Sequence, residues 1–432
     1  MGRRNGGLYM ENVNSAFVKR TQWMYIWQAA LEHLISILVA GSYLATLTRE
    51  LGFSDSLTGI LSSIISLGSL FQLMTVTLRR RRVKGIVVTL SILNQLLFAL
   101  LYVIPLSGIG QKAKIVVFVV FIVSAYMAYN FAHPKKINWL MSLVDDRQRG
   151  SFTANKEIVS LLAGMIFSFL MGAVTDYFSE IGQIRIAFMI SAGVIFGLMV
   201  LHSFCLLGTS EQEMPETPKK SIFTDIGDIF RNKAVLKVTG VFVIYYIAKS
   251  ISVPFYGTYL INELGCNLKF ISALSIFSSI ARILVSKFLG RYADKKSFAD
   301  MIEKCFLIMA LGHLCVICAV PANGKIMFAL YYLFQGVAMG GVNSALVNLV
   351  FDYVPYEKRS NSLAVCQAAS GTVGFFATLL VSPLVSRIQG NGNTFMGIHI
   401  YAQQLFTILS FTLLLLSALY VRLVLIRRKK DA

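Results

Sequence analysis

The sequence predicts an all-α polytopic membrane protein with twelve transmembrane helices in two pseudo-symmetric six-helix bundles. The first observation behind this fold class is composition, because 56% of the 432 residues are hydrophobic and only 14% are charged. Soluble domains carry roughly 25% charged residues, and the mean hydropathy of +0.67 agrees with the difference. The other two observations are the length of the apolar blocks and a similarity between the two halves of the chain.

The apolar residues are gathered into blocks that are long enough to cross a bilayer. A hydrocarbon core of ~30 Å requires about 20 helical residues, and backbone polar groups in lipid must be paired within each helix. The expected spans cover residues 23–46, 57–78, 85–106, 115–141, 157–178, 185–208, 237–261, 269–289, 301–320, 325–350, 361–386 and 397–425.

The basic residues predict the orientation of these spans. The net charge is +19, but it is spread over alternate connections between apolar blocks, so nucleic acid is not an expected partner. With the N-terminus inside, 29 of the 40 Lys and Arg lie in inside segments, 7 in outside segments and 4 within spans. The positive-inside rule therefore places both termini in the cytoplasm. We expect a multi-pass protein of the cytoplasmic (plasma) membrane that contacts anionic lipids and is a monomer.

Polar segments divide the chain into five parts. No cleavable signal is expected, because the apolar block after the first 22 residues is longer than a signal-peptide core. In the central linker, residues 222–230 form either a short amphipathic helix on the membrane surface or part of a flexible connection. The expected parts are a cytoplasmic segment over 1–22, a first bundle over 23–208, a linker over 209–236, a second bundle over 237–425 and a basic tail over 426–432.

The two halves share anchor residues in the same order along the chain, which is the third observation. The anchors lie at corresponding helix ends, so we expect that a six-helix unit was duplicated. The matched anchors are Tyr43-Leu44 with Tyr259-Leu260 and Ser62-Ser63-Ile64 with Ser278-Ser279-Ile280, both at an offset of 216 residues.

The connection between the eighth and ninth expected spans carries the most specific motif, Gly290-Arg291-Tyr292-Ala293-Asp294-Lys295-Lys296. A Gly, an Asp four residues later and then basic residues resemble the loop motif of the major facilitator superfamily, in which two six-helix halves rock around a central site. The resemblance covers the whole twelve-span pattern. It implies a secondary active transporter that moves a small solute by alternating access. It also implies a conformational latch of Gly290, Arg291, Asp294 and Lys295, with the Asp294 carboxylate near a helix N-terminus of the other half.

The sequence departs from the superfamily pattern in two places. The first-half counterpart of the motif, Met74 to Arg80, lacks both the Gly and the Asp. The fifth span has Gly164 and Gly172 but not the glycine–proline signature of the drug antiporters. The subfamily, and with it the substrate, is therefore unassigned.

Few ionisable side chains lie deep inside the expected spans, where each costs at least ~2.5–3.5 kcal/mol. Such a residue is retained where it lines a wet cavity or pairs with another charge. Neutral polar residues in spans bind either a polar solute or a neighbouring helix. The candidates for a substrate and ion pathway are Glu32, His33, Lys135, Lys136, Lys249, Arg282 and Asn343, followed by Asn94, Gln95, Asn130, Gln335, Asn348, Gln367 and the aromatic Tyr126, Tyr129, Tyr245, Tyr246 and Tyr256.

Glu32 is the only acid expected deep in the bilayer, which suits a site for a coupling proton or cation. The alternative is a structural ion pair with Lys135 or Lys136. Lys249 corresponds to His33 at the offset of 216, so spans one and seven are expected to present polar residues at matching depth. Lys249 then attracts an anionic substrate group, holds Glu32 ionised, or forms a purely structural pair.

Two further features have open alternatives. Arg282 either binds an anion through its guanidinium group or extends toward the inner surface as a structural residue. Pro134 removes a backbone N–H donor near the inner end of the fourth span. It therefore predicts either a local break that gates the inner side or a static kink.

Other functions are weighed against transport. A membrane-embedded lipid-processing enzyme requires a catalytic cluster, and the five His show no ligand spacing with acids. A lipid flippase and a transporter-like sensor remain alternatives. No metal or other cofactor is expected, and the phosphate-binding pattern G-x-x-x-x-G-K-[ST] is absent from the sequence. The expected partners are a small-molecule substrate and a coupling proton or cation.

Overall fold

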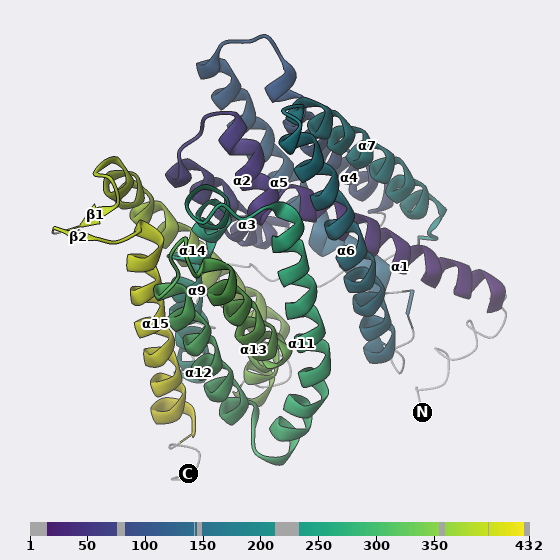
Figure 1. Ribbon diagram of the computed structural model, residues 1–432. Helices are drawn as coiled ribbons and strands as arrows, with labels where there is room; N and C mark the ends of the chain where they lie inside the picture. Colours follow the sequence, from purple (N-terminus) through teal and green to yellow (C-terminus); the bar gives the residue numbers. More distant parts are fainter. Residues whose placement is uncertain are drawn as a thin grey trace, which may run out of the picture.

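The computed structural model describes residues 15–75, 83–141, 143–144, 149–211, 233–353, 359–395 and 397–426, and these form a mainly helical molecule (Figure 1). The first half contains α1 (Ser15–Leu38), α2 (Gly41–Glu50), α3 (Asp55–Thr75), α4 (Lys84–Leu101), η1 (Ile104–Leu106), α5 (Gln111–Met141), α6 (Arg149–Glu180) and α7 (Ile184–Gly208). The second half contains α9 (Lys233–Ser250), η2 (Val253–Phe255), α10 (Tyr256–Thr258), η3 (Tyr259–Glu263), α11 (Leu268–Lys295), α12 (Phe298–Ile317), α13 (Gly324–Tyr353), α14 (Arg359–Gly390), a hairpin of β1 (Thr394–Phe395) and β2 (Ile398–His399), α15 (Ala402–Tyr420) and η5 (Val421–Ile426).

The described helices follow the predicted order of spans. Among the described residues, nine helical segments are long and apolar enough to cross a membrane, and the bent pair of α1 and α2 makes a tenth. The other two are α3, which ends where a described range ends, and α12, whose first two turns carry three charged residues. Several predicted features lie outside the described residues, namely most of the loop at 74–80, the segment at 222–230 and the tail from 427 onward.

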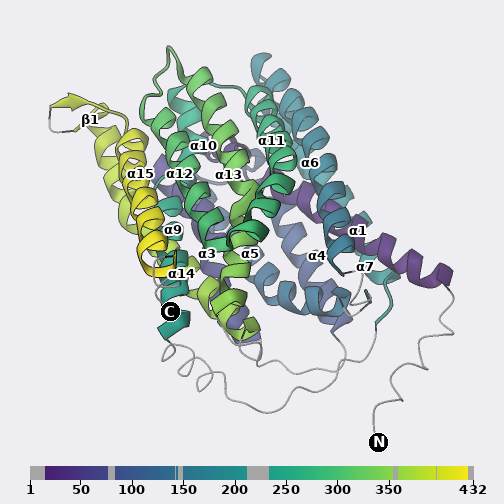
Figure 2. The ribbon, with the colours of Figure 1, turned by 90° about the horizontal axis from the view of Figure 1, so that it is seen from below.

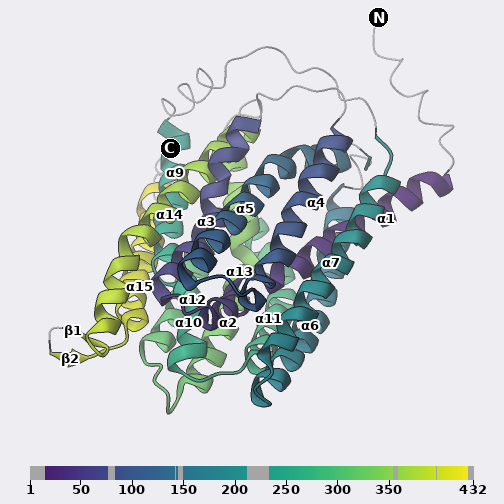
Figure 3. The ribbon, with the colours of Figure 1, turned by 90° about the horizontal axis from the view of Figure 1, so that it is seen from above.

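α1 begins and η5 ends on the same side of the molecule, which lies uppermost in Figure 3. We call this the terminal side and the opposite side the distal side. Successive long helices alternate in direction, so the α2–α3 turn and the β1–β2 hairpin lie on the distal side. Among the described residues, two pairs of long helices join the halves: α3 packs on α14 (Figure 3) and α6 packs on α11 (Figure 2).

The buried apolar side chains show where the halves are joined. One cluster combines both halves at the distal side, with Tyr43 and Leu47 of α2 beside Tyr259 and Leu264. Two other clusters each belong to a single half. One joins Tyr25 with residues of α4, α5 and α7, and the other joins α9, α12, α13 and α15. The core is therefore continuous between the halves at the distal side and separate toward the terminal side.

The first and seventh predicted spans are broken near their middles, which corrects the expectation of uninterrupted helices over 23–46 and 237–261. α1 and α2 meet at an angle of 42°, and Gly41 at the break has a φ of +52°. α9 ends at Ser250 and gives way to the short 3-10 helix η2, which has a Pro in its first turn. The two breaks lie at similar positions along the two spans, as expected for a duplicated unit.

Pro134 does not break the fourth span, so the local break, which was one of the two alternatives, is not found. α5 is helical without interruption from Gln111 to Met141. A proline within a helix removes one backbone hydrogen bond without necessarily ending the helix when neighbouring helices hold it in place, and α5 packs on both α3 and α4.

Candidate functional site

A cavity of about 480 Å³ lies between the two halves, where the broken helices meet; we call it the central cavity. Ala40 and Gly41 line it at the α1–α2 break, and Val253 and Gly257 line it at the equivalent break of the second half. Most of the remaining wall comes from α1, α6, α11 and α13. Both halves therefore contribute to one site, and a movement of either half changes its shape.

The two breaks approach each other more closely than side chains would allow. A methyl group placed on Gly257 lies 2.9 Å from the carbonyl carbon and oxygen of Gly41. These two glycines are themselves 216 residues apart in the sequence. The distal wall of the central cavity is thus formed by direct contact between the backbones of α2 and α10.

A second cavity, of about 390 Å³, lies within the first half; we call it the charged cavity. Its lining includes Glu32, His133, Lys156 and Glu157, so acids and bases face the same space. His33 lines both cavities. The two cavities therefore meet at α1. Glu32 lines the charged cavity, and the next residue, His33, lines both cavities.

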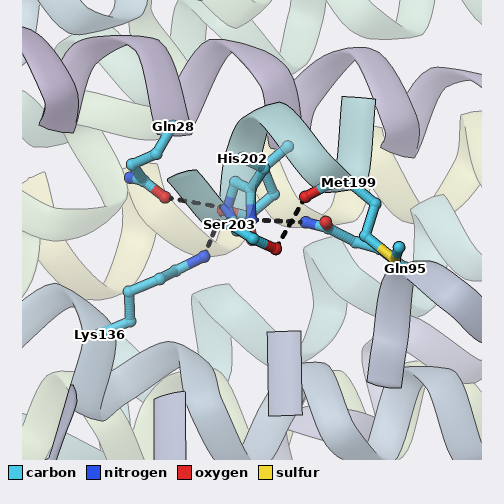
Figure 4. A network of polar contacts seen from close by, with 7 residues as sticks. Gln28, Gln95, Lys136, Met199, His202 and Ser203 are labelled. Carbon is cyan, nitrogen blue, oxygen red and sulfur yellow. Dashed lines mark hydrogen bonds and ion pairs between the residues drawn. The ribbon is translucent and has the colours of Figure 1, made fainter. Parts of the chain in front are cut away.

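Glu32 forms an ion pair with Lys136 of α5. The Lys136 side chain is only 5% exposed, whereas the Glu32 side chain is 20% exposed and reaches the cavity. His202 of α7 approaches the same carboxylate oxygen as Lys136, with Nε2 3.9 Å from Oε2 of Glu32. Figure 4 shows how Lys136 and His202 converge from different helices.

The hydrogen bonds of His202 define its uncharged form. Gln95 Nε2 lies 3.1 Å from His202 Nδ1, so this amide donates and Nδ1 accepts. The hydrogen of the ring is then on Nε2, which lies 3.2 Å from Gln28 Oε1 (Figure 4). The Oε1 atom of Gln95 is buried and has no partner among the described residues. Lys136 therefore supplies the positive charge that balances Glu32.

The structure selects among the sequence alternatives for the basic residues. Lys136, and not Lys249, is the ion-pair partner recorded for Glu32. Lys249 is exposed at the last turn of α9, one turn before Val253 of the central cavity, and no described residue pairs with it. Lys135 is buried. The predicted proximity of Glu32 and Lys249 is not seen in this conformation.

Arg282 of α11 lies 3.7 Å from Glu157 of α6, so this pair joins the two halves. Glu157 also lines the charged cavity. Arg282 thus has a specific acidic partner, as a structural role requires, and the sequence did not indicate that partner. Asn343 is exposed on α13 and has no recorded contact among the described residues.

Polar contacts between the halves reinforce the distal closure. Asp176 at the end of α6 accepts hydrogen bonds from the backbone N–H groups of Leu268 and Lys269, at 2.9 and 2.6 Å. The carboxylate of the first half therefore caps the positive N-terminus of α11 in the second half. Asp55 of α3 accepts bonds from Asn262 and Gln389, both at 2.8 Å.

The predicted latch residues lie at the opposite end of α11. Arg291, Asp294 and Lys295 are exposed, and nothing lies within 4 Å of a methyl group placed on Gly290. In the described part of the chain, no helix N-terminus is bonded to Asp294. The contact expected of Asp294 at the terminal side is made in this conformation by Asp176 at the distal side.

Sequence reasoning missed four site residues. His202 and Gln28 are single polar residues in apolar spans, and nothing in their spacing relates them to Glu32. Asp176 and Asp55 lie at span ends, where acids are common on water-facing surfaces. The role of Asp176 could have been predicted only if the packing of the fifth span on the eighth had been known, because that packing places Asp176 at the start of the eighth span.

Comparisons with known proteins agree on one fold. The family model of the Major Facilitator Superfamily matches residues 29–378 and 238–432. Three solved structures are similar over nearly the whole chain, and no curated protein sequence matches it. At these identities the likeness shows the fold, and it confirms the predicted twelve-helix, two-bundle architecture. The structures are the POT family transporter PepTSo (TM-score 0.71, 12% identity, 96% of this chain and 99% of that one), a D-xylose-proton symporter (0.66, 12%, 94% and 97%) and the nucleoside transporter NupG (0.64, 13%, 94% and 98%).

Proposed function

Since this chain belongs to the Major Facilitator Superfamily, we propose that it is a proton-coupled secondary active transporter of a small solute. The substrate occupies the central cavity, and the coupling proton binds Glu32. The single observation that carries this proposal is the position of Glu32. It lines the charged cavity, and the next residue of α1, His33, lines the central cavity.

The Glu32–Lys136 pair supplies a physical means of coupling. When Glu32 is ionised, it holds Lys136 and thereby fixes α1 against α5. A proton on the carboxylate cancels the attraction, and the buried ammonium group then lacks its counter-charge, which is costly in a poorly solvated site. α1 also forms part of the wall of the central cavity, at His33 and Ile37. Proton binding and substrate binding therefore act on the same helix.

The distal side corresponds to the outside of the cell in this proposal, and the terminal side to the cytoplasm. The shared apolar core and the cap by Asp176 close the outer side in this conformation. The latch at Asp294 then belongs to the opposite conformation, in which the inner ends of the halves approach each other. A ligand shifts such an equilibrium only by the difference in its affinity for the two states.

Reporter fusions test the orientation. Reporters placed after Lys220 and after Lys430 are expected to be cytoplasmic, and a reporter near Ser107 external, because Lys and Arg are concentrated in the inside segments. A dual reporter that is active only on one side of the membrane measures this at each position. An external signal after Lys430 would contradict an even number of spans.

Vesicle experiments test the coupling. Purified protein in liposomes is expected to accumulate its substrate above equilibrium only when a proton gradient is imposed, because the solute gradient is driven through Glu32. Collapse of the gradient by a protonophore should reduce uptake to equilibration. Substrates are first found by thermal-shift screening of the purified chain against metabolite classes. Accumulation that is equal with and without the gradient would argue for a uniporter or for another coupling ion.

A further inference from the structure

The central cavity is uncharged, in contrast to the neighbouring charged cavity. Among the described residues, its lining contains no Asp, Glu, Lys or Arg. His33 is the one histidine in that lining. An ionised substrate that entered this space would lose its hydration without gaining a counter-charge, and that loss is large. An uncharged substrate meets no such penalty.

Three serine hydroxyl oxygens and one amide oxygen on the wall are hydrogen-bond acceptors. Ser275 and Ser279 donate their hydroxyl hydrogens to helix carbonyls at 3.1 and 2.9 Å, and Ser272 donates to the carbonyl of Ser168 at 3.1 Å. Because each hydroxyl hydrogen is used in this way, what each of these groups has left for a ligand is the accepting capacity of its oxygen. The Oε1 atom of Gln335, which also lines the cavity, is buried and lacks a partner in the described part of the chain. The wall is suited to a ligand with several donors.

The wall of the cavity also has an aromatic part, next to these polar residues. Tyr256, Tyr331 and Tyr332 line the cavity together, and the rings of Tyr256 and Tyr331 lie edge to face with centroids 5.2 Å apart. The hydroxyl of Tyr256 is already bonded to Thr407 at 2.9 Å, so its ring rather than its oxygen faces the ligand. Aromatic side chains provide a large, rigid apolar surface against which a flat or ring-shaped molecule packs.

We propose that the substrate is an uncharged, hydroxyl-bearing ring compound, namely a nucleoside or a free sugar. Its hydroxyl groups donate to the serine lone pairs of α11 and to Gln335, and its ring packs on the tyrosines of α10 and α13. A volume of about 480 Å³ has room for one molecule of this size. This inference rests on the proposed function, because it assigns the substrate of that same transporter.

The inference replaces the anionic substrate that Lys249 suggested from the sequence. Lys249 is not among the lining residues and lies one helical turn nearer the terminal side. In the proposed arrangement it belongs to the entrance of the cavity. There the bound substrate does not touch it.

Binding measurements on the full-length protein in nanodiscs test the substrate class. The probes are uridine, D-glucose, uridine 5′-monophosphate and L-glutamate, measured by calorimetry and thermal shift without any gradient. We expect uridine or D-glucose to bind, and the monophosphate to bind at least tenfold more weakly than uridine. Binding of uridine alone identifies a nucleoside, and binding of both or of D-glucose alone identifies a sugar. Tighter binding of either anion, or no binding of the two neutral probes at millimolar concentration, would overturn the proposal.

A variant locates the site. Gln335→Leu removes the unpaired acceptor and is expected to weaken binding of the neutral probe by tenfold or more. Asn348→Leu is the matched control on the same helix, because its amide bonds to Ser344 and it does not line the cavity. Equal affinities for the two variants would overturn the placement. A protein that binds a neutral probe but does not accumulate it in a proton gradient would refute the coupling alone.

Discussion

Glu32→Gln is expected to abolish gradient-driven accumulation of substrate while exchange of substrate across the membrane persists. The carboxamide cannot take up or release a proton, so the step that links the two gradients is lost. The substrate still binds in the central cavity, whose lining does not include Glu32. Accumulation and exchange are measured in parallel on the same vesicles.

A competing outcome is that Glu32→Gln destabilises the protein. Glu32→Gln also leaves Lys136 without its partner, and Lys136 has a side chain that is only 5% exposed. Removing one member of a buried ion pair costs about 3–5 kcal/mol when the pair is fully buried, so the melting temperature of this variant should fall. The double variant Glu32→Gln with Lys136→Met removes both charges and should recover much of that stability.

The double variant separates the two roles of Glu32. If the residue binds the coupling proton, the double variant is stable but still does not accumulate substrate. If the pair is only structural, the double variant recovers both stability and accumulation. Glu157→Gln is the matched control, since Glu157 lines the same cavity but is exposed, and its partner Arg282 is only half-buried. Normal accumulation by Glu32→Gln would exclude the coupling role directly.

Hydropathy and charge predicted the spans and the scarce deep charges because both depend on local composition. Local composition did not predict which lysine pairs with Glu32. Lys135 and Lys136 are neighbours in the sequence, and about 100° of rotation around α5 separates their side chains. The rotation of α5 about its axis is set by packing against α3 and α4, so no local pattern distinguishes the two lysines.

The contribution of His202 was unpredictable for a related reason. Its partners Gln28 and Gln95 come from α1 and α4, and all three residues meet only after the bundle is assembled. A single His in an apolar span gives no signal of such a network. The break at Gly41 was also missed, because a glycine in an apolar run is tolerated in many transmembrane helices. Its left-handed backbone is evident only in the structure.

Gly257→Ala is expected to open the outer side of the protein. The added methyl group lies 2.9 Å from the carbonyl carbon and oxygen of Gly41, and these backbone atoms cannot rotate away. α2 and α10 must therefore separate, and they belong to different halves. Overpacking of this kind costs about 1–3 kcal/mol, which corresponds to a fall of roughly 5- to 150-fold in the closed-to-open ratio.

Cys266 reports this opening. It is 4% exposed and lies beside the start of α11 at the distal side, where the closed halves cover it. With Cys315 and Cys318 replaced by Ser, an impermeant maleimide added outside should label Cys266 several-fold faster in Gly257→Ala than in the parent. Transport should slow, since the cycle requires the outer side to close. Gly197→Ala is the control, because nothing lies within 4 Å of a methyl group at that position on α7. Equal labelling and transport in both variants would mean that the contact between Gly41 and Gly257 does not hold the outer side closed.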